Sequence, residues 1–152
     1  MRIEGYASLW GVADLNGDVV QRGAFADTLA KTGAEGVRML WQHDGREVIG
    51  RWDEVVENER GLFVAGDIGD WSSQARMARA VCGAGAVDGL SIGYRTAKAR
   101  KQGRLRVLSG VALWEVSVVT FPACPGARLR VCGGSGIDVA TGFRKSERGR
   151  RR

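Results

Sequence analysis

The fold of this chain is decided by residues 90–120, which read LSIGYRTAKARKQGRLRVLSGVALWEVSVVT. Apolar and β-branched residues fill both ends of this stretch, and Gln102-Gly103 has the composition of a turn. The pattern therefore predicts the two longest strands of the chain, 90–101 and 104–120, joined as a hairpin. The basic residues near the middle are expected to lie at the hairpin tip, in solvent.

The predicted hairpin brings a serine and a carboxylate together. If the turn is Gln102-Gly103, Ser91 falls opposite Trp114; if the loop has three residues, Ser91 falls opposite Glu115. Cross-strand and diagonal neighbours lie roughly 5–8 Å apart, a gap that one imidazole can bridge. Glu115 is a lone carboxylate in an apolar segment, where burial without a partner is costly.

His43 is the only histidine of the chain, and it ends a predicted strand over 37–43. A serine, a histidine and an acid are the parts of a nucleophile, a base and an orienting group. Asp44 is a poor orienter, because adjacent strand residues point to opposite faces. Each residue also has a plain structural alternative: Ser91 as a small residue in a crowded turn, His43 as a core histidine, Glu115 at a strand edge facing water.

The segment Gly89-Leu90-Ser91-Ile92-Gly93 also fits the G-x-S-x-G nucleophile elbow. That elbow needs a strand, a sharp turn and then a helix, with the histidine last in the chain. Here the histidine comes first and an extended run follows the serine, so the elbow fold is rejected.

The remainder of the chain predicts a mainly β fold with a few helices (α+β). Alternating patterns indicate further strands at 2–10, 19–20, 48–56 and 62–68, and helices at 23–32 and 70–82, the second with Asp70 as its N-cap. We expect a closed or nearly closed antiparallel β-barrel of about seven strands with the helices packed outside. Residues 1–132 form one domain, and 133–152 form a Gly/Ser/Arg-rich basic tail that is expected to be disordered.

Charge and cysteine content exclude several classes of function. Residues 144–152 carry six basic residues and one acid, which leaves a net charge of only +1 on residues 1–143 (17 Lys and Arg against 16 Asp and Glu). A near-neutral fold gives no support for specific nucleic-acid binding. Three cysteines without a CxxC pair, beside one histidine, make a metal site improbable. No apolar run is long enough to span a membrane, and the N-terminus lacks a signal-peptide core.

Four stretches, covering nearly all of residues 3–127, resemble the prohead (capsid maturation) serine proteases of tailed bacteriophages, also carried by prophages and gene transfer agents. They are Gly5-Tyr6-Ala7-Ser8 with Asp18-Val19-Val20 and Gly23-Ala24-Phe25; Leu40-Trp41-Gln42-His43-Asp44; Gly89-Leu90-Ser91-Ile92-Gly93-Tyr94; and Glu115-Val116-Ser117-Val118-Val119-Thr120 before Pro122-Ala123.

The resemblance implies a barrel like that of the herpesvirus assemblins, with His43 as base and Ser91 as nucleophile. The third position, a histidine in the herpesvirus enzymes, falls on Glu115. The loop after the last strand helps to form the oxyanion hole in the related viral enzymes, which points to the backbone N–H groups of Ala123 and Cys124. Here Cys124 stands where the family often has asparagine.

The predicted function is therefore that of a serine endopeptidase. It would cleave scaffold segments or extensions of the major capsid protein during procapsid maturation, and cleave itself, without a cofactor. It would act in the cytoplasm of the bacterial host, inside assembling procapsids, with a homodimer left open. The alternatives are a non-catalytic capsid-assembly module and a small-molecule esterase that uses the same Ser-His-Glu site.

Overall fold

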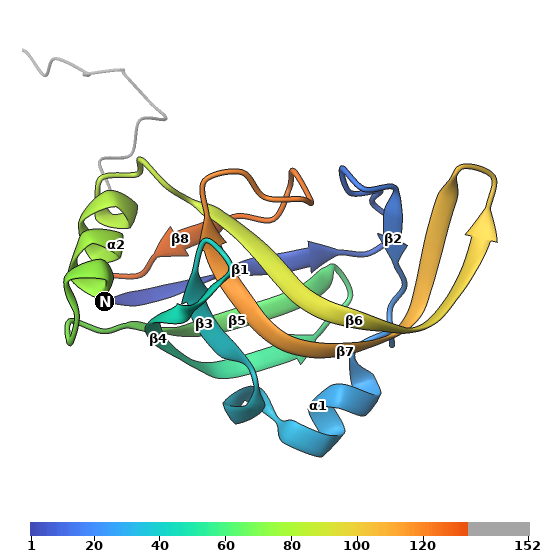
Figure 1. Ribbon diagram of the computed structural model, residues 1–152, viewed down its shortest axis with the longest axis horizontal. Coiled ribbons are helices and arrows are strands. Elements are labelled where there is room, and N and C mark those ends of the chain that lie inside the picture. The colour runs from blue at the N-terminus through green and yellow to red at the C-terminus, as the bar shows by residue number, and fades with distance from the viewer. Residues whose placement is uncertain (134–152) are drawn as a thin grey trace, which may run out of the picture.

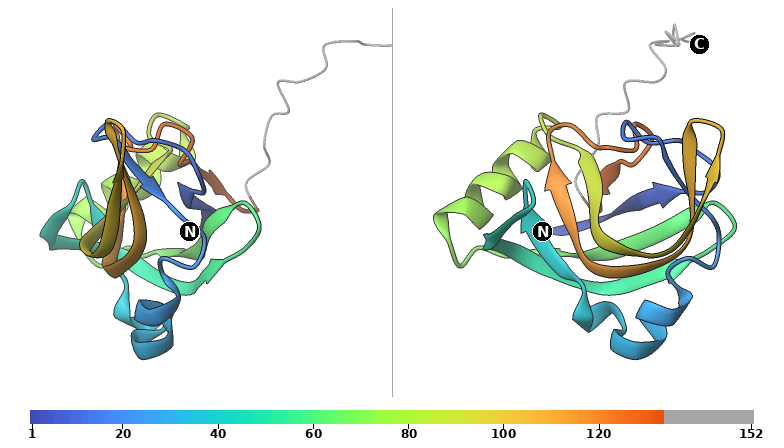
Figure 2. Two further views of the ribbon diagram at one scale, coloured as in Figure 1. Left: turned by 90° about the vertical axis from the view of Figure 1, so that its right-hand side faces the viewer. Right: turned by 45° about the vertical axis from the view of Figure 1, so that its right-hand side comes forward.

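The computed structural model describes residues 1–133, which fold into one curled sheet with helices on its outside (Figures 1 and 2). The elements are β1 (Arg2–Leu9), β2 (Asp18–Val20), α1 (Ala26–Thr32), the 3-10 turn η1 (Ala34–Gly36), β3 (Arg38–Trp41), β4 (Asp44–Glu57), β5 (Gly61–Ile68), α2 (Ser73–Gly83), β6 (Gly89–Gln102), β7 (Leu105–Val119) and β8 (Leu129–Val131). The tail predicted to be disordered lies, from residue 134 on, outside the described residues.

The strands follow the order β2-β7-β3-β4-β5-β1-β8, with β6 paired to β7. An isolated bridge between Gly89, at the start of β6, and Arg128, just before β8, links β8 back to β6 and so brings together the ends of the run β6-β7-β3-β4-β5-β1-β8. Leu90 N–H also donates to the carbonyl of Ala127 at 3.0 Å. Seven strands thus run around a nearly closed ring, which agrees with the expected barrel of about seven strands. The set of strands differs, because β8 was not predicted and the predicted strand at 19–20 is the short β2, which lies outside the ring beside β7.

Strand β7 is the central element, because it pairs with β6, β3 and β2. Its pairing with β6 is antiparallel as predicted, whereas its pairings with β3 and β2 are parallel. Parallel neighbours need long crossover connections, and the chain from β4 to β6 supplies one between β3 and β7. The expectation of a purely antiparallel barrel is wrong in these two places.

The hairpin register differs from both predicted alternatives. Gln102 faces Leu105 across a two-residue turn, Gly103-Arg104, in which Gly103 has φ +63°. Register shifts occur at three points along the hairpin. With this turn alone, Ser91 would lie opposite Val116. The three shifts together add a net displacement of one residue, so Ser91 lies opposite Ser117 rather than opposite Trp114 or Glu115.

Both helices cover the outside of the sheet (Figure 1). In α2, Ala75, Ala78 and Cys82 face the core. Its N-cap is Ser72, whose hydroxyl accepts from Ala75 N–H at 3.0 Å, so the prediction of Asp70 as the cap is wrong. A side-chain oxygen at the cap satisfies one of the amide groups that the first turn leaves unpaired.

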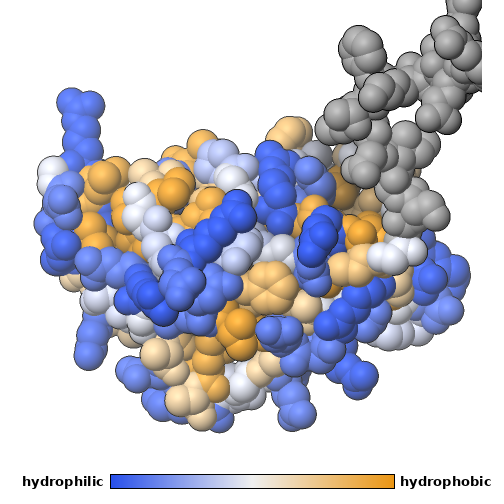
Figure 3. Space-filling model, turned by 180° about the vertical axis from the view of Figure 1, so that it is seen from behind, coloured by the Kyte–Doolittle hydropathy of each residue, from blue (hydrophilic) through white to orange (hydrophobic). Residues whose placement is uncertain are grey.

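The core contains large, fully buried side chains from β1, from β3 to β7 and from the segment before α1, including Trp52, Phe25, Ile3, Met39 and Leu90. The indole of Trp52 donates to the carbonyl of Val116 at 3.2 Å, which connects β4 to β7 through the interior. Seen from behind, hydrophilic residues predominate on the surface with apolar ones interspersed among them (Figure 3). In residues 1–133, no helix is long and apolar enough to cross a membrane.

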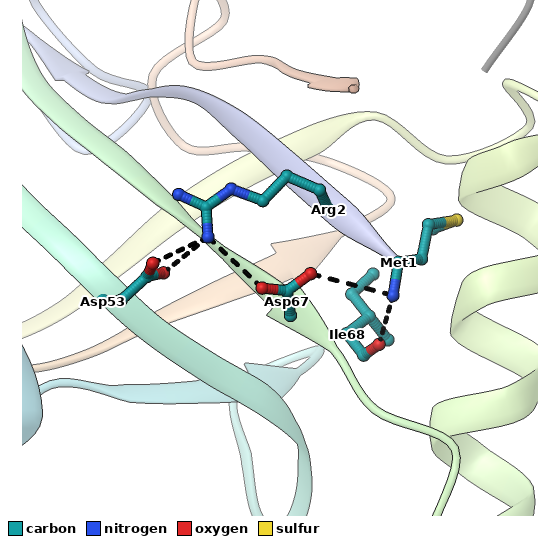
Figure 4. A network of polar contacts seen from close by, with 5 residues as sticks. All are labelled: Met1, Arg2, Asp53, Asp67 and Ile68. Carbon is teal, nitrogen blue, oxygen red and sulfur yellow. Dashed lines mark hydrogen bonds and ion pairs between the residues drawn. The ribbon is translucent and has the colours of Figure 1, made fainter. Parts of the chain in front are cut away.

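Polar contacts at the N-terminus hold three strands in register (Figure 4). The terminal amine of Met1 donates to the carbonyl of Ile68 at 2.8 Å. The guanidinium of Arg2 reaches Asp53 on β4 at 2.7 Å and Asp67 on β5 at 3.2 Å. These ion pairs are exposed, so they contribute little free energy of folding and mainly select the register.

Candidate active site

His43 lies in the tight turn between β3 and β4, and not on the strand that the sequence pattern predicted. Strand β3 ends at Trp41, which faces Asp44 across the turn. The two turn residues, Gln42 and His43, have φ of 52° and 60°. Positive φ at both positions is the signature of a type I′ hairpin turn, which usually contains Asn or Gly. The period-two pattern of residues 37–43 predicted a strand through His43, so the turn was not predicted.

The strained turn is held by hydrogen bonds to the end of β7. Gln42 N–H donates to the carbonyl of Val118 at 2.9 Å, and His43 N–H donates to Oγ of Ser117 at 3.1 Å. The side-chain amide of Gln42 bonds Thr120 twice: Nε2 donates to Oγ1 at 2.7 Å, and Oε1 accepts from the backbone N–H at 3.1 Å. A left-handed conformation in a non-glycine residue persists when the surrounding structure imposes it in this way.

The imidazole of His43 contacts Glu115, which the sequence pattern proposed as its partner. Nδ1 of His43 and Oε1 of Glu115 are 2.5 Å apart. The carboxylate is buried, with 7% of its side chain exposed, and its other oxygen accepts from the hydroxyl of Ser117 at 2.6 Å. Because a carboxylate accepts, Nδ1 carries the proton and Nε2 is left for a second partner.

Asp44 does not compete for this role. Its carboxylate accepts from Nε and Nη2 of Arg46 at 3.0 and 2.9 Å. The bonds with Arg46 lower the pKa of Asp44 to about 2. The alternation argument against Asp44 does not apply, because His43 lies in a turn; the bonds to Arg46 are what direct the Asp44 carboxylate away.

Glycine at position 93 creates the space that the Glu115 carboxylate occupies. Gly93 faces Glu115 across the β6–β7 hairpin. A Cβ atom at Gly93 would lie 2.2 Å from Oε1 of Glu115. At Gly89, a Cβ would lie 2.4 Å from the carbonyl oxygen of Val119. The two glycines of the G-x-S-x-G match therefore serve cross-strand packing and not a nucleophile elbow.

Ser91 and His43 reach the wall of one small cavity of about 150 Å³. Ala123 and Cys124, in the loop between β7 and β8, line the same cavity. Ser91 is 5% exposed and stands on β6 directly opposite Ser117. The three predicted side chains thus meet at one place: Glu115 behind the imidazole, and Ser91 with His43 at the cavity.

The bond to Glu115 raises the pKa of His43 above its ordinary value of 6.5, and partial burial opposes this rise. The nearby carboxylate favours the imidazolium over the neutral ring. A base placed in this way accepts a proton readily and is stabilised once it carries the charge.

Sequence reasoning missed a second polar group at the cavity. Asp18, quoted above only within a stretch that carries the family resemblance, is 5% exposed and lines the cavity. Its carboxylate accepts from Nε and Nη2 of Arg106 and from the hydroxyl of Tyr94, each at 2.7 Å. Hydrogen bonds from Arg106 chiefly, and from Tyr94, lower the pKa of Asp18 against the effect of burial.

The cysteines lie apart from one another, and all three are free. Burial raises the pKa of the Cys82 thiol in α2 to about 11, which keeps it protonated. In residues 1–133, no group of three or more His, Cys, Asp or Glu side chains is placed to hold a metal ion.

A curled β-barrel in which a serine and a histidine line one cavity, with a glutamate bonded to the far side of the imidazole, has the constellation of a serine hydrolase. The chain belongs to the family of caudovirus prohead serine proteases, whose family model matches residues 1–136. The prohead protease of Enterobacteria phage HK97 is 37% identical over 124 residues, which are 79% of this chain and 55% of that protein. The chain thus spans about half the length of this curated relative.

Solved structures with the same fold come from herpesviruses. The protease of varicella-zoster virus matches with a TM-score of 0.54 at 14% identity, over 84% of this chain and 62% of that one. The protease of Kaposi's sarcoma herpesvirus matches with a TM-score of 0.51 at 12% identity, over 84% and 63%. At this level of identity the likeness establishes the fold, and the assemblin-like fold predicted from the sequence is confirmed.

Proposed function

We propose that this protein is a serine endopeptidase of procapsid maturation in which Ser91 is the nucleophile, His43 the general base and Glu115 the orienting acid. The observation that carries the proposal is that Ser91 and His43 line one cavity while Glu115 holds Nδ1 of the imidazole at 2.5 Å. Membership of the prohead protease family supports the peptide bond as the bond that is cleaved.

The proposed reaction is acyl transfer. Oγ of Ser91 attacks the carbonyl carbon of the scissile peptide, and its proton passes to Nε2 of His43. The tetrahedral intermediate collapses, His43 returns the proton to the leaving amine, and the C–N bond breaks. Water then attacks the acyl-serine with the same base and regenerates the hydroxyl. Glu115 stabilises the imidazolium in both half-reactions.

The oxyanion needs donors close to Ser91, and the β7–β8 loop supplies the candidates. Ala123 and Cys124 line the cavity with Ser91. In residues 1–133, no hydrogen bond uses the N–H group of either residue, so both donors are available to a ligand. The carbonyl of Ala123 accepts from Leu15 N–H at 2.9 Å, which anchors this loop to the loop before β2. Two fixed N–H groups at this position would stabilise the negative charge.

The proposed substrates are polypeptides of the assembling procapsid: scaffold segments, extensions of the major capsid protein, and the protease itself. Family membership supports this class of substrate and a location inside procapsids in the bacterial host. The enzyme could work as a monomer or as a homodimer, and the experiment described next also measures its oligomeric state.

The test is co-expression with the major capsid protein encoded beside this protein, followed by mass spectrometry of the N-terminus of that capsid protein. We expect a defined new terminus with the parent chain and none with Ser91→Ala or His43→Ala. Because the two residues act as one unit, the double variant is expected to be no worse than either single variant. Size-exclusion chromatography with light scattering on the same samples gives the oligomeric state.

Two outcomes would replace the proposal. An unprocessed capsid protein that nevertheless assembles normally with both the parent and Ser91→Ala would indicate a non-catalytic assembly module. Hydrolysis of small esters that depends on Ser91, without cleavage of any polypeptide, would indicate an esterase on the same site.

A further inference from the structure

Ser117 links His43 and Glu115 in one closed ring of hydrogen bonds. The N–H group of His43 donates to Oγ of Ser117 at 3.1 Å. That hydroxyl donates to Oε2 of Glu115 at 2.6 Å, and Oε1 of Glu115 is 2.5 Å from Nδ1 of His43. The ring of hydrogen bonds therefore starts at the backbone of His43 and returns to its imidazole.

The position of Ser117 leaves few substitutes for its hydroxyl. Ser117 is fully buried at 0% exposure, and Glu115 is 5% exposed. Without the hydroxyl, water would have little access to Oε2 of Glu115. A buried acceptor that loses its partner destabilises the fold, and a charged one does so more strongly.

We infer that Ser117 is a positioning residue of the base: its one hydroxyl fixes both the left-handed turn that carries His43 and the carboxylate that orients the imidazole. This inference rests on the proposed function for its link to catalysis. Ser117 does not contact a reacting atom; it acts through His43 and Glu115. The register also makes Ser117 the cross-strand partner of the proposed nucleophile, Ser91.

The hydroxyl also shares the negative charge of Glu115 with the imidazole. When this donor is removed, the carboxylate depends more strongly on the imidazolium, so the pKa of His43 is expected to rise further. The other charged groups beside the imidazole have partners of their own. Asp44 and Arg46 on β4 pair with each other, and Arg38 on β3 donates to the carbonyl of Glu35. Across the cavity, Asp18 pairs with Arg106, and Asp14 accepts from two backbone N–H groups.

The chain provides a clean probe, because His43 is its only histidine and gives a single set of imidazole NMR signals. The experiment is a pH titration of these signals in a Ser91→Ala background, which prevents self-cleavage. Ser117→Ala is compared with Thr28→Val, the matched control. Thr28 also joins its hydroxyl to β7, through the N–H and C=O of Leu113 at 3.2 and 3.5 Å, without a bond to the site.

We expect Ser117→Ala to raise the imidazole pKa by about half a unit and Thr28→Val to leave it unchanged. In the parent with Ser91 intact, Ser117→Ala is expected to lower kcat by roughly 10–100-fold with little change in KM. An imidazole titration that is the same in Ser117→Ala as in Thr28→Val overturns the inference. So does a shifted titration that leaves kcat at the parental value.

A second measurement needs no substitution of Ser117, so it holds even if Ser117→Ala does not fold. In the Ser91→Ala protein, the His43 amide should exchange with solvent slowly, because it donates to a buried oxygen. Exchange at the rate of a free turn amide overturns the inference. Titration and exchange report on Ser117 whether or not the chain cleaves a polypeptide, so failure of the proposed protease activity is distinguished from failure of this inference.

Discussion

Gly93 and Glu115 face each other across the β6–β7 hairpin so closely that a methyl group on Gly93 would lie 2.2 Å from Oε1 of the carboxylate. The proposed orienting acid thus occupies the volume that a side chain at position 93 would fill. Position 93, two residues after the proposed nucleophile, is therefore expected to need glycine because of the proposed base and its acid, and not because of the nucleophile.

Gly93→Ala is therefore expected to abolish most of the activity by displacing Glu115 from the imidazole. A misplacement of about 1 Å can cost on the order of 10²-fold in rate, and we expect at least that loss in kcat. Gly45→Ala, in β4 close to the same histidine, is the control, because an added Cβ there has nothing within 4 Å. Equal kcat for the two variants in a peptide-cleavage assay would contradict the steric argument.

Replacing His43 separates function from stability. The residue has φ 60°, which glycine adopts without strain and alanine does not. Both His43→Gly and His43→Ala should be inactive, yet His43→Gly should be more stable by about 1 kcal/mol. The measurement is chemical denaturation of the two variants side by side. A less stable glycine variant would mean that the left-handed turn is not maintained in solution.

The pH dependence follows from the raised pKa of His43, caused first by its bond to Glu115. Because the folded pKa exceeds the unfolded one, the ion pair stabilises the fold fully below the unfolded pKa and loses that contribution as pH rises through the folded pKa. Catalysis needs the neutral imidazole, so kcat/KM should rise over the same interval. A pH–rate profile whose acid limb lies at or below 6.5, the ordinary value for histidine, would contradict this expectation.

Glu115→Gln tests the acid directly. It should keep the fold and slow cleavage by ~10²–10⁴-fold, because the amide no longer stabilises the imidazolium. Glu115→Asp should be intermediate, since its shorter side chain does not reach as far. The controls are Asp44→Asn and Asp88→Asn, whose carboxylates pair with Arg46 at 2.9 Å and Arg128 at 2.6 Å. If Glu115→Gln were fully active and Asp44→Asn or Asp88→Asn were inactive, the role of orienting acid would be assigned to Asp44 or Asp88 instead of Glu115.

Local patterns in the sequence were enough to predict most elements. Alternation and turn residues placed the strands around Ile3, Val64 and Val118 and the two helices outside the sheet, because these signals depend on neighbours a few residues away. The sequence also limited the choice of site residues. The chain has one histidine, and Glu115 is the only acid between Asp88 and Asp138. Few residues could therefore be proposed as the base and its acid.

The tertiary structure alone decided how these residues meet. The parallel pairing of β3 with β7 sets Arg38 opposite Glu115 and brings the following turn beside Ser117. The left-handed conformation of His43 has no local signal, because only long-range hydrogen bonds to β7 maintain it. The position of the hairpin turn and a net register shift of one residue set Ser91 opposite Ser117. Such shifts arise where packing on both faces of a sheet must be satisfied together, which no local pattern records.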